Sequence, residues 1–289
     1  MIDENKIKFD YAQVGGVKLH YATAGDGERL VVLLHGFPEF WYSWRHQIIA
    51  LSDECTVIAP DMRGYNLSDK PTKIEDYQIN KLVDDVTGLI DHFGHENAAV
   101  VGHDWGAAVA WTLAQNHPEY VWKLAALQVP PVSVWQKNQT FRQFLASWYM
   151  FFFQIPKLPE WLMTRSNFAI LENALKNTTA ERDVFKSEDI ERYKESWSEP
   201  FALTAMVNYY RANIFKRLFS KPEKQEKIRV PTVFIYGEKD HAILPETVKN
   251  IGEAIDAPFE QFHIPDARHW VQQEASETVT EILREFLAK

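Results

Sequence analysis

Short apolar runs alternate with longer amphipathic segments along most of this chain. Apolar and polar residues alternate at 17–24, and Gly15-Gly16 joins that segment to 9–14, which predicts a β-hairpin. Continuous apolar runs bounded by turn residues are typical of strands that are covered on both faces. Such strands are predicted at 30–34, 57–59, 98–101, 124–129 and 232–236, and a further strand is predicted at 259–264.

Helical patterns fill most of the intervals between these strands. The clearest covers 76–94, where apolar residues recur every three or four positions and Gly94 supplies a C-cap. Other helices are predicted at 44–51, at 107–114, near 245–255 and at the C-terminus. This alternation predicts an α/β fold, with a mostly parallel sheet and helices on both of its faces.

The alternation of strands and helices breaks in one place. Residues 133–219 show a helical, aromatic and irregular pattern, and the charged segment 221–227 is interpreted as the linker back to the sheet. We therefore expect a core domain formed by 1–132 and 220–289, with a helical domain, 133–219, inserted into it.

Charge and composition narrow the class of protein. The net charge of −9 disfavours a nucleic-acid partner, and the single cysteine, Cys55, allows no intrachain disulfide. The charged N-terminus lacks the apolar region of a secretory signal. The longest apolar run, 144–153, is far shorter than the roughly 18 residues of a membrane span. We expect a cytoplasmic protein without a membrane span.

The predicted strand 98–101 leads into G-x-D-x-G, the spacing of a nucleophile elbow. In this turn a strand passes into a helix so tightly that Gly102 and Gly106 leave no room for a Cβ atom. The residue between them is held exposed above the sheet. Here it is Asp104 in place of the usual serine.

An aspartate at this position changes the chemistry. Its carboxylate, with an ordinary pKa of about 3.9, is already an anion at neutral pH. An adduct with a carbonyl group collapses by expelling the carboxylate, but displacement at a saturated carbon leaves a stable alkyl ester. Asp104 therefore predicts a covalent route with a strained ether ring or a carbon–halogen bond as the electrophile.

Hydrolysis of such an ester needs a base and an acid that orients it. Asp240 follows the strand 232–236, and His269 follows 259–264, in the chain order nucleophile, acid, histidine. We expect His269 to deprotonate a water molecule while Asp240 holds the imidazole tautomer. Three nearby groups are interpreted as structural: His241, His263 and Asp266.

The backbone N–H groups of Phe37 and Trp105 are the candidates for an oxyanion hole. Phe37 follows the first buried strand in His35-Gly36-Phe37-Pro38, and Trp105 follows the nucleophile. We interpret His35 as structural and expect a cis peptide bond before Pro38.

Together, four motifs resemble those of soluble epoxide hydrolases of the α/β-hydrolase fold. The motifs are H-G-F-P-E at 35–39, W-Y-S-W at 41–44, D-M-R-G-Y at 61–65 and G-H-D-W-G at 102–106. The resemblance extends over nearly the whole chain from about Lys6. One departure is Asn66, where the family usually has glycine; asparagine tolerates a positive φ better than other side chains do.

The resemblance implies that the inserted helical domain is a cap that supplies two tyrosines to the epoxide oxygen. Tyr149 matches the first tyrosine and Tyr210 the second, with the adjacent Tyr209 as its rival. A phenol can protonate a departing alkoxide and stay neutral at pH 7. Adjacent helical residues point about 100° apart, so only one of 209 and 210 should face the site.

The implied substrates are a small apolar epoxide and water, with no metal or cofactor, because no H-E-x-x-H motif or Cys/His cluster is present. Candidates for the pocket wall are Phe37, Trp105, Trp135 and Phe141, with Phe144, Trp161 and Phe168 as further aromatic residues of the insertion. The physiological substrate, the stereochemistry and the oligomeric state stay open.

Three other functions are weighed against epoxide hydrolysis. Haloalkane dehalogenases share the elbow aspartate and the following tryptophan, but their halide commonly needs an asparagine side chain where this chain has Phe37. Fluoroacetate-type dehalogenases carry arginines just after the nucleophile, where this chain has Trp105, Ala107 and Ala108. A non-catalytic ligand-binding protein would not need the complete set of reactive residues.

Overall fold

The computed structural model describes residues 4–181, 183–219 and 226–289. Within these residues eight strands form one sheet, in the order β1-β2-β4-β3-β5-β6-β7-β8. The pairs β1·β2 and β2·β4 are antiparallel, and the pairs from β4·β3 to β7·β8 are parallel. The strands are β1 (Lys8–Val14), β2 (Val17–Ala24), β3 (Leu30–Leu34), β4 (Thr56–Pro60), β5 (Ala98–His103), β6 (Val121–Leu127), β7 (Thr232–Gly237) and β8 (Phe259–Ile264). The predicted hairpin and the mostly parallel sheet are confirmed.

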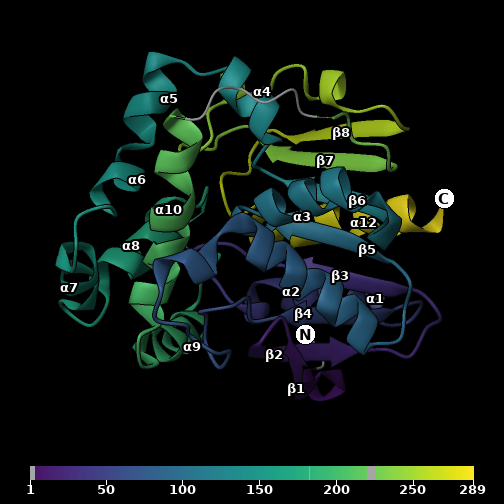
Figure 1. Ribbon diagram of the computed structural model, residues 1–289, viewed down its shortest axis with the longest axis horizontal. Helices are drawn as coiled ribbons and strands as arrows, with labels where there is room; N and C mark the ends of the chain where they lie inside the picture. Colours follow the sequence, from purple (N-terminus) through teal and green to yellow (C-terminus); the bar gives the residue numbers. More distant parts are fainter. Residues whose placement is uncertain (1–3, 182, 220–225) are drawn as a thin grey trace.

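Helices cover both faces of the sheet, as predicted (Figure 1). On one face α2 (Ile79–His92) packs against α3 (Trp105–Asn116), and on the other α1 (Arg45–Leu51) packs against α12 (Ser276–Ala288). The central strands β3 and β5 are buried along their whole length, because they are covered from both sides. A short α11 (Val271–Glu274) precedes α12.

Three predicted elements differ from the observed ones. The helix predicted at 76–94 begins only at Ile79, because Gln78 is extended, with a ψ of 144°, after the 3₁₀ turn Ile74–Tyr77. The strand predicted at 124–129 runs from Val121 to Leu127, since Gln128 has a φ of 66° and leaves the extended region. The helix predicted near 245–255 is wrong: the segment forms two short 3₁₀ turns, Pro245–Val248 and Ile251–Ala254. Lys249 is extended and Asn250 is left-handed, so the backbone between the turns cannot continue a helix.

Residues 132–219, here called the insertion, connect β6 to the segment before β7 and lie beyond one end of the sheet (Figure 1). Residues 221–225 of the predicted linker lie outside the described part of the chain. No helix in the described ranges is long and apolar enough to cross a membrane. The helices of the insertion are α4 (Val132–Lys137), α5 (Phe141–Ala146), α6 (Trp148–Phe152), α7 (Leu158–Thr164), α8 (Ala169–Asn177), α9 (Ser187–Ser198) and α10 (Ala202–Phe219).

The turn from β5 into α3 requires two glycines, as predicted from their spacing. A Cβ atom on Gly102 would lie 2.3 Å from the carbonyl oxygen of Gly106, and one on Gly106 would lie 2.1 Å from the carbonyl oxygen of Leu34. Both neighbours are backbone atoms of buried segments, so they cannot rotate away. The close approach of β3, β5 and α3 therefore depends on the missing side chains.

We expect Gly102→Ala to lower the free energy of unfolding by about 1–3 kcal/mol, the usual cost of forcing extra volume into a packed core. Urea-induced unfolding, followed by circular dichroism, measures this change. Gly252→Ala is the matched control, because a Cβ atom there meets only the Phe259 ring at 3.4 Å. Equal stability of the two variants would contradict the steric explanation.

Candidate active site

Asp104 lies at the turn between β5 and α3 with a φ of 51° and a ψ of −116°. This conformation is rare for a residue with a side chain and projects the carboxylate away from the sheet. Its Oδ1 accepts a hydrogen bond from the N–H of Phe37 at 2.9 Å. A Cβ atom on Gly36 would lie 2.4 Å from that of Asp104, so glycine is needed for this approach.

His269 lies between the two carboxylates that the sequence analysis selected. Its Nδ1 is 2.8 Å from Oδ2 of Asp240, and its Nε2 is 3.7 Å from Oδ2 of Asp104. Burial by itself lowers the pKa of His269, but the two carboxylates outweigh it and hold that pKa well above its usual value. Burial likewise raises the pKa of Asp104, yet His269 and the Phe37 N–H bring it below its usual value. The two carboxylates therefore favour the protonated form of His269.

Gln128 anchors the carboxylate of Asp240 and was not selected from the sequence. Its Nε2 donates to Oδ2 of Asp240 at 2.7 Å and to the carbonyl oxygen of Arg268 at 2.8 Å, while its Oε1 accepts from Gly237 N–H at 2.6 Å. Oδ1 of Asp240 accepts from the N–H groups of residues 242 and 243. The sequence signal that could have identified Gln128 is its place as a polar residue at the end of a buried strand, two residues before Pro130-Pro131.

A second buried pair, His103 and Glu39, supports His269 through its backbone. His103 Nε2 donates to the carbonyl oxygen of His269 at 2.8 Å, and its Nδ1 is 2.9 Å from Oε2 of Glu39. Gln272 and Gln273 donate to the same carboxylate. Because His103 precedes Asp104 directly, one strand end positions both the predicted nucleophile and the loop that carries the predicted base. Sequence analysis used both residues only as parts of motifs.

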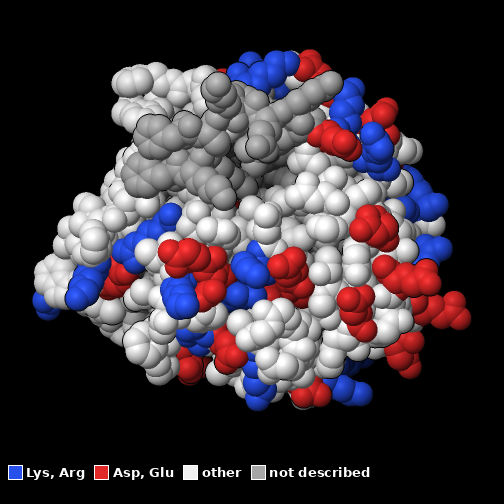
Figure 2. All heavy atoms as spheres, in the orientation of Figure 1, with Lys and Arg blue, Asp and Glu red and all other residues white. Residues whose placement is uncertain are grey.

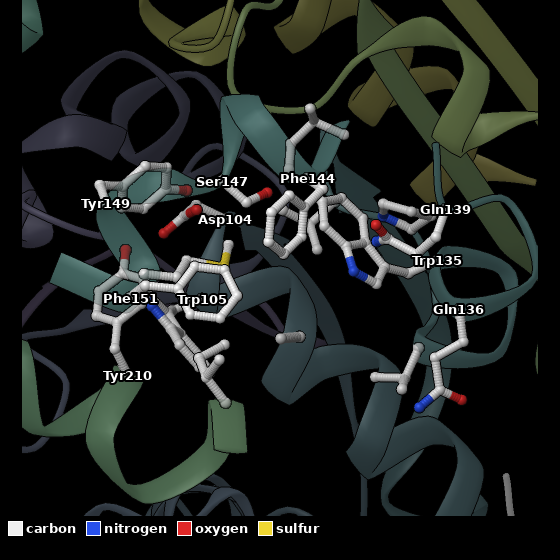
Figure 3. Close-up of a pocket in the computed structure, with 17 residues that line it drawn as sticks. Asp104, Trp105, Trp135, Gln136, Gln139, Phe144, Ser147, Tyr149, Phe151 and Tyr210 are labelled. Carbon is white, nitrogen blue, oxygen red and sulfur yellow. The ribbon is translucent and has the colours of Figure 1, made fainter. Parts of the chain in front are cut away.

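The insertion contributes Tyr149 from α6 and Tyr210 from α10, whose ring centroids are 5.9 Å apart. Both line the pocket that contains Asp104, and Figure 3 shows their hydroxyl groups on the side of the pocket where Asp104 lies. Burial, followed by the charge of Asp104, raises the pKa of both phenols above its usual value, so both stay protonated. The hydroxyl of Tyr209 instead donates to the carbonyl oxygen of Arg63 at 2.6 Å. Tyr210 therefore faces the pocket and Tyr209 does not.

The pocket wall matches the sequence predictions only in part. Trp105, Trp135 and Phe144 line it (Figure 3), whereas Phe37 does not line it and contacts the ring of Tyr210 instead. Phe141 does not line it and is a correction: its side chain is 75% exposed on the outer side of α5. Gln143, which projects from the opposite side of the helix, takes the inward position.

The remaining predicted residues lie as follows. Trp161 is half-exposed, and Phe168 packs against Trp197 away from this pocket. His35 is buried, where Nε2 accepts from Met62 N–H and Nδ1 lies 3.0 Å from the carbonyl oxygen of Gly36, which agrees with a structural role. The Phe37–Pro38 peptide bond is cis, and Asn66 has a positive φ of 41°, as predicted.

The other polar groups near the site are tied to local contacts. His263 lies 3.3 Å from Glu238, and Asp266 pairs with Lys239 at the surface. Within residues 4–181, 183–219 and 226–289, no cluster of three or more His, Cys, Asp or Glu side chains is placed to hold a metal ion.

Comparison with known proteins places this arrangement among related chains. The alpha/beta hydrolase fold family matches residues 29–276. An AB hydrolase superfamily protein of Bacillus subtilis is 42% identical over 97% of this chain and 98% of its own length. Epoxide hydrolase 1 of Caenorhabditis elegans is 37% identical over 96% of this chain and 70% of its own. The crystal structure of a Bacillus megaterium epoxide hydrolase with an inhibitor superposes with a TM-score of 0.89 at 34% identity, covering 97% of this chain and all of the other.

We expect Asp240→Asn to lower the pKa of His269, because removing a carboxylate at 2.8 Å destabilises the imidazolium. A pH titration of the histidine ring signals by NMR measures this pKa. Asp266→Asn is the control: its carboxylate pairs with Lys239 at the surface and should leave the pKa of His269 unchanged. An unaltered pKa in Asp240→Asn would show that Asp240 does not stabilise the imidazolium.

Proposed function

The chain belongs to the α/β-hydrolase fold family and, within it, to the epoxide hydrolases, and we propose that it converts small apolar epoxides to vicinal diols through an ester on Asp104. One observation carries the proposal. A single pocket brings the ionised carboxylate of Asp104 together with the neutral phenols of Tyr149 and Tyr210. This combination provides a nucleophile for carbon and proton donors for the oxygen that leaves it.

Ring opening uses Asp104 on one side of the pocket and the two tyrosines of the insertion on the other. Oδ1 of Asp104 is occupied by the Phe37 N–H, which leaves Oδ2 to form the bond to an epoxide carbon as the carbon–oxygen bond of the ring breaks. The departing oxygen would otherwise become an alkoxide. Hydrogen bonds from Tyr149 and Tyr210 stabilise it and deliver its proton.

Ester formation prepares His269 for the second step. The ester removes the negative charge of Asp104, one of the two charges that raise the pKa of His269, and so favours the neutral imidazole. The proton that His269 loses restores the phenol that protonated the epoxide oxygen, so both tyrosines are neutral again. The neutral Nε2 then takes a proton from water, and the resulting hydroxide attacks the ester carbonyl.

The tetrahedral intermediate places its negative charge on Oδ1. The N–H of Phe37, already 2.9 Å from this atom, and the N–H of Trp105 form the oxyanion hole. Collapse of the intermediate breaks the bond between the carboxyl carbon and the oxygen of the substrate. The leaving oxygen takes the proton of the new carboxyl group, so the diol leaves, the carboxylate of Asp104 is restored, and His269 keeps the proton that it took from water.

We propose the same division of the chain as the sequence analysis: a core of 1–132 and 220–289 and a cap of 133–219. The core supplies Asp104, Asp240 and His269, and the cap supplies the two phenols. The free, buried Cys55 and the net charge of −9 support a cytoplasmic enzyme that acts on small molecules and not on nucleic acid.

We expect His269→Ala to stop the reaction at the ester, because no base remains to activate water. After incubation with styrene oxide, the intact mass of the variant should rise by the mass of one epoxide, and peptide mapping should locate the adduct on Asp104. Asp104→Asn is the control and should gain no mass. An unaltered protein that ignores epoxides but turns over alkyl bromides would instead be a haloalkane dehalogenase.

We expect Tyr149→Phe and Tyr210→Phe each to slow ester formation by about 100-fold, the usual effect of losing one donor to a developing oxyanion. Single-turnover kinetics with styrene oxide measure this step. Tyr209→Phe is the matched control, because its hydroxyl bonds to Arg63 outside the pocket. It should lose about 1 kcal/mol of stability and keep the rate of ester formation. Equal rates in all three variants would exclude the phenols as donors.

A further inference from the structure

In helix α5 and at the start of α6, polar side chains face inward and large apolar side chains face outward, which is the reverse of an ordinary surface helix. Phe141, Leu145 and Trp148 are 75%, 54% and 63% exposed, whereas Gln143 and Ser147 are buried. Buried polar and exposed large apolar side chains are the informative exceptions in a folded protein. An apolar stripe therefore faces outward along this part of the insertion.

The inward polar residue has a defined structural function. Gln143 Nε2 donates to the carbonyl oxygen of Ala242 at 2.7 Å, and its Oε1 accepts from Leu244 N–H at 2.8 Å. It also bonds to Ser147. These contacts tie α5 to the loop that follows Asp240. The orientation of the helix is thus set by polar contacts inside, which do not account for the aromatic residues outside.

The apolar stripe continues beyond α6 into α7. Helices α5, α6 and α7 lie along one margin of the molecule (Figure 1). We define the outer face as the set of exposed apolar side chains on these helices and the segment that joins them. Its members are Phe141, Leu145, Trp148, Ile155, Leu158 and Trp161. Several large apolar side chains exposed on one side of a protein often mark an interaction site.

The charge of the outer face is opposite to that of the chain. Between residues 141 and 165 the charged side chains are Arg142, Lys157, Glu160 and Arg165. Glu160 is largely buried and pairs with Arg211, so its charge is compensated. Arg142 pairs with Glu246, and Arg165 lies over the ring of Trp161 at 4.2 Å. Because the charge of Arg142 is compensated as well, Lys157 and Arg165 carry the positive charge of the face in a protein of net charge −9. Figure 2 shows mostly white atoms at this margin, with blue and some red ones among them.

The pocket of Asp104 reaches the surface beside the outer face. Phe144 and Gln139 line the pocket and are themselves exposed. Phe144 belongs to the same helix as Phe141 and Leu145. A partner surface that covered the outer face would thus lie next to the entrance of the pocket.

We propose that the outer face docks this protein on the surface of a lipid bilayer that contains anionic lipids. Trp148 and Trp161 suit the interfacial region, and Lys157 and Arg165 suit its negative headgroups. An apolar epoxide dissolves in the bilayer and would enter the pocket directly from it. This supply of substrate rests on the proposed function, whereas the docking does not. A second copy fits the face less well, because like charges would meet across the contact.

Sedimentation with vesicles tests the docking without any measurement of activity. The full chain should bind vesicles of phosphatidylcholine with about 30 mol% phosphatidylglycerol and bind pure phosphatidylcholine at least ten-fold more weakly. Added salt should weaken the binding. Phe141→Ser/Leu145→Ser/Trp148→Ser should bind the anionic vesicles at least ten-fold more weakly, and so should Lys157→Glu/Arg165→Glu.

The control is Leu67→Ser, which removes an exposed apolar side chain elsewhere and should bind as the unaltered protein does. Turnover of dissolved styrene oxide and thermal unfolding should stay unchanged in every variant, which separates loss of docking from loss of function or fold. Absence of vesicle binding, equal binding by the triple variant, or equal binding to both lipid mixtures would overturn the proposal. So would self-association in sedimentation velocity that the triple variant abolishes, because the face would then join two copies.

Discussion

A buried carboxylate on a strained turn is the constraint on which the rest of the site depends. Asp104 has a positive φ, and burial opposes its ionisation. Three groups compensate and lower the pKa of Asp104: His269 at 3.7 Å, His103, and the Phe37 N–H at 2.9 Å. The turn itself exists only because Gly102 and Gly106 let backbones approach closely. Strain, burial and charge at one residue thus determine what must surround it.

The position of the His269 ring depends on more contacts than its hydrogen bond with Asp240. Asp240 binds the ring, Gln128 binds Asp240 from the end of β6, and His103 binds the backbone of His269. These contacts come from three neighbouring strand ends, which lie close together because the strands are parallel. In the proposed reaction, these contacts hold the imidazole ring in position while the charge of Asp104 changes.

Much of the core could be predicted from the sequence, because the signals there are local. Periodicity and bounding turn residues located the strands, and the order of Asp104, Asp240 and His269 after successive strands indicated a shared site. The prediction failed where two backbone conformations compete within a few residues. At 249–250 an extended residue and a left-handed one break the helix that the apolar spacing predicted.

The sequence by itself determined the candidate reactive groups: an elbow carboxylate, a histidine and an acid, each identified by its place after a strand. Only the tertiary structure decided which side chains face one another. It turned Tyr210 inward and Tyr209 toward Arg63, and it placed Gln143 inside α5 and Phe141 outside. The physical reason is that strand order and turn chemistry are encoded locally, whereas the face that a helix buries depends on the polar and apolar partners it meets across the fold.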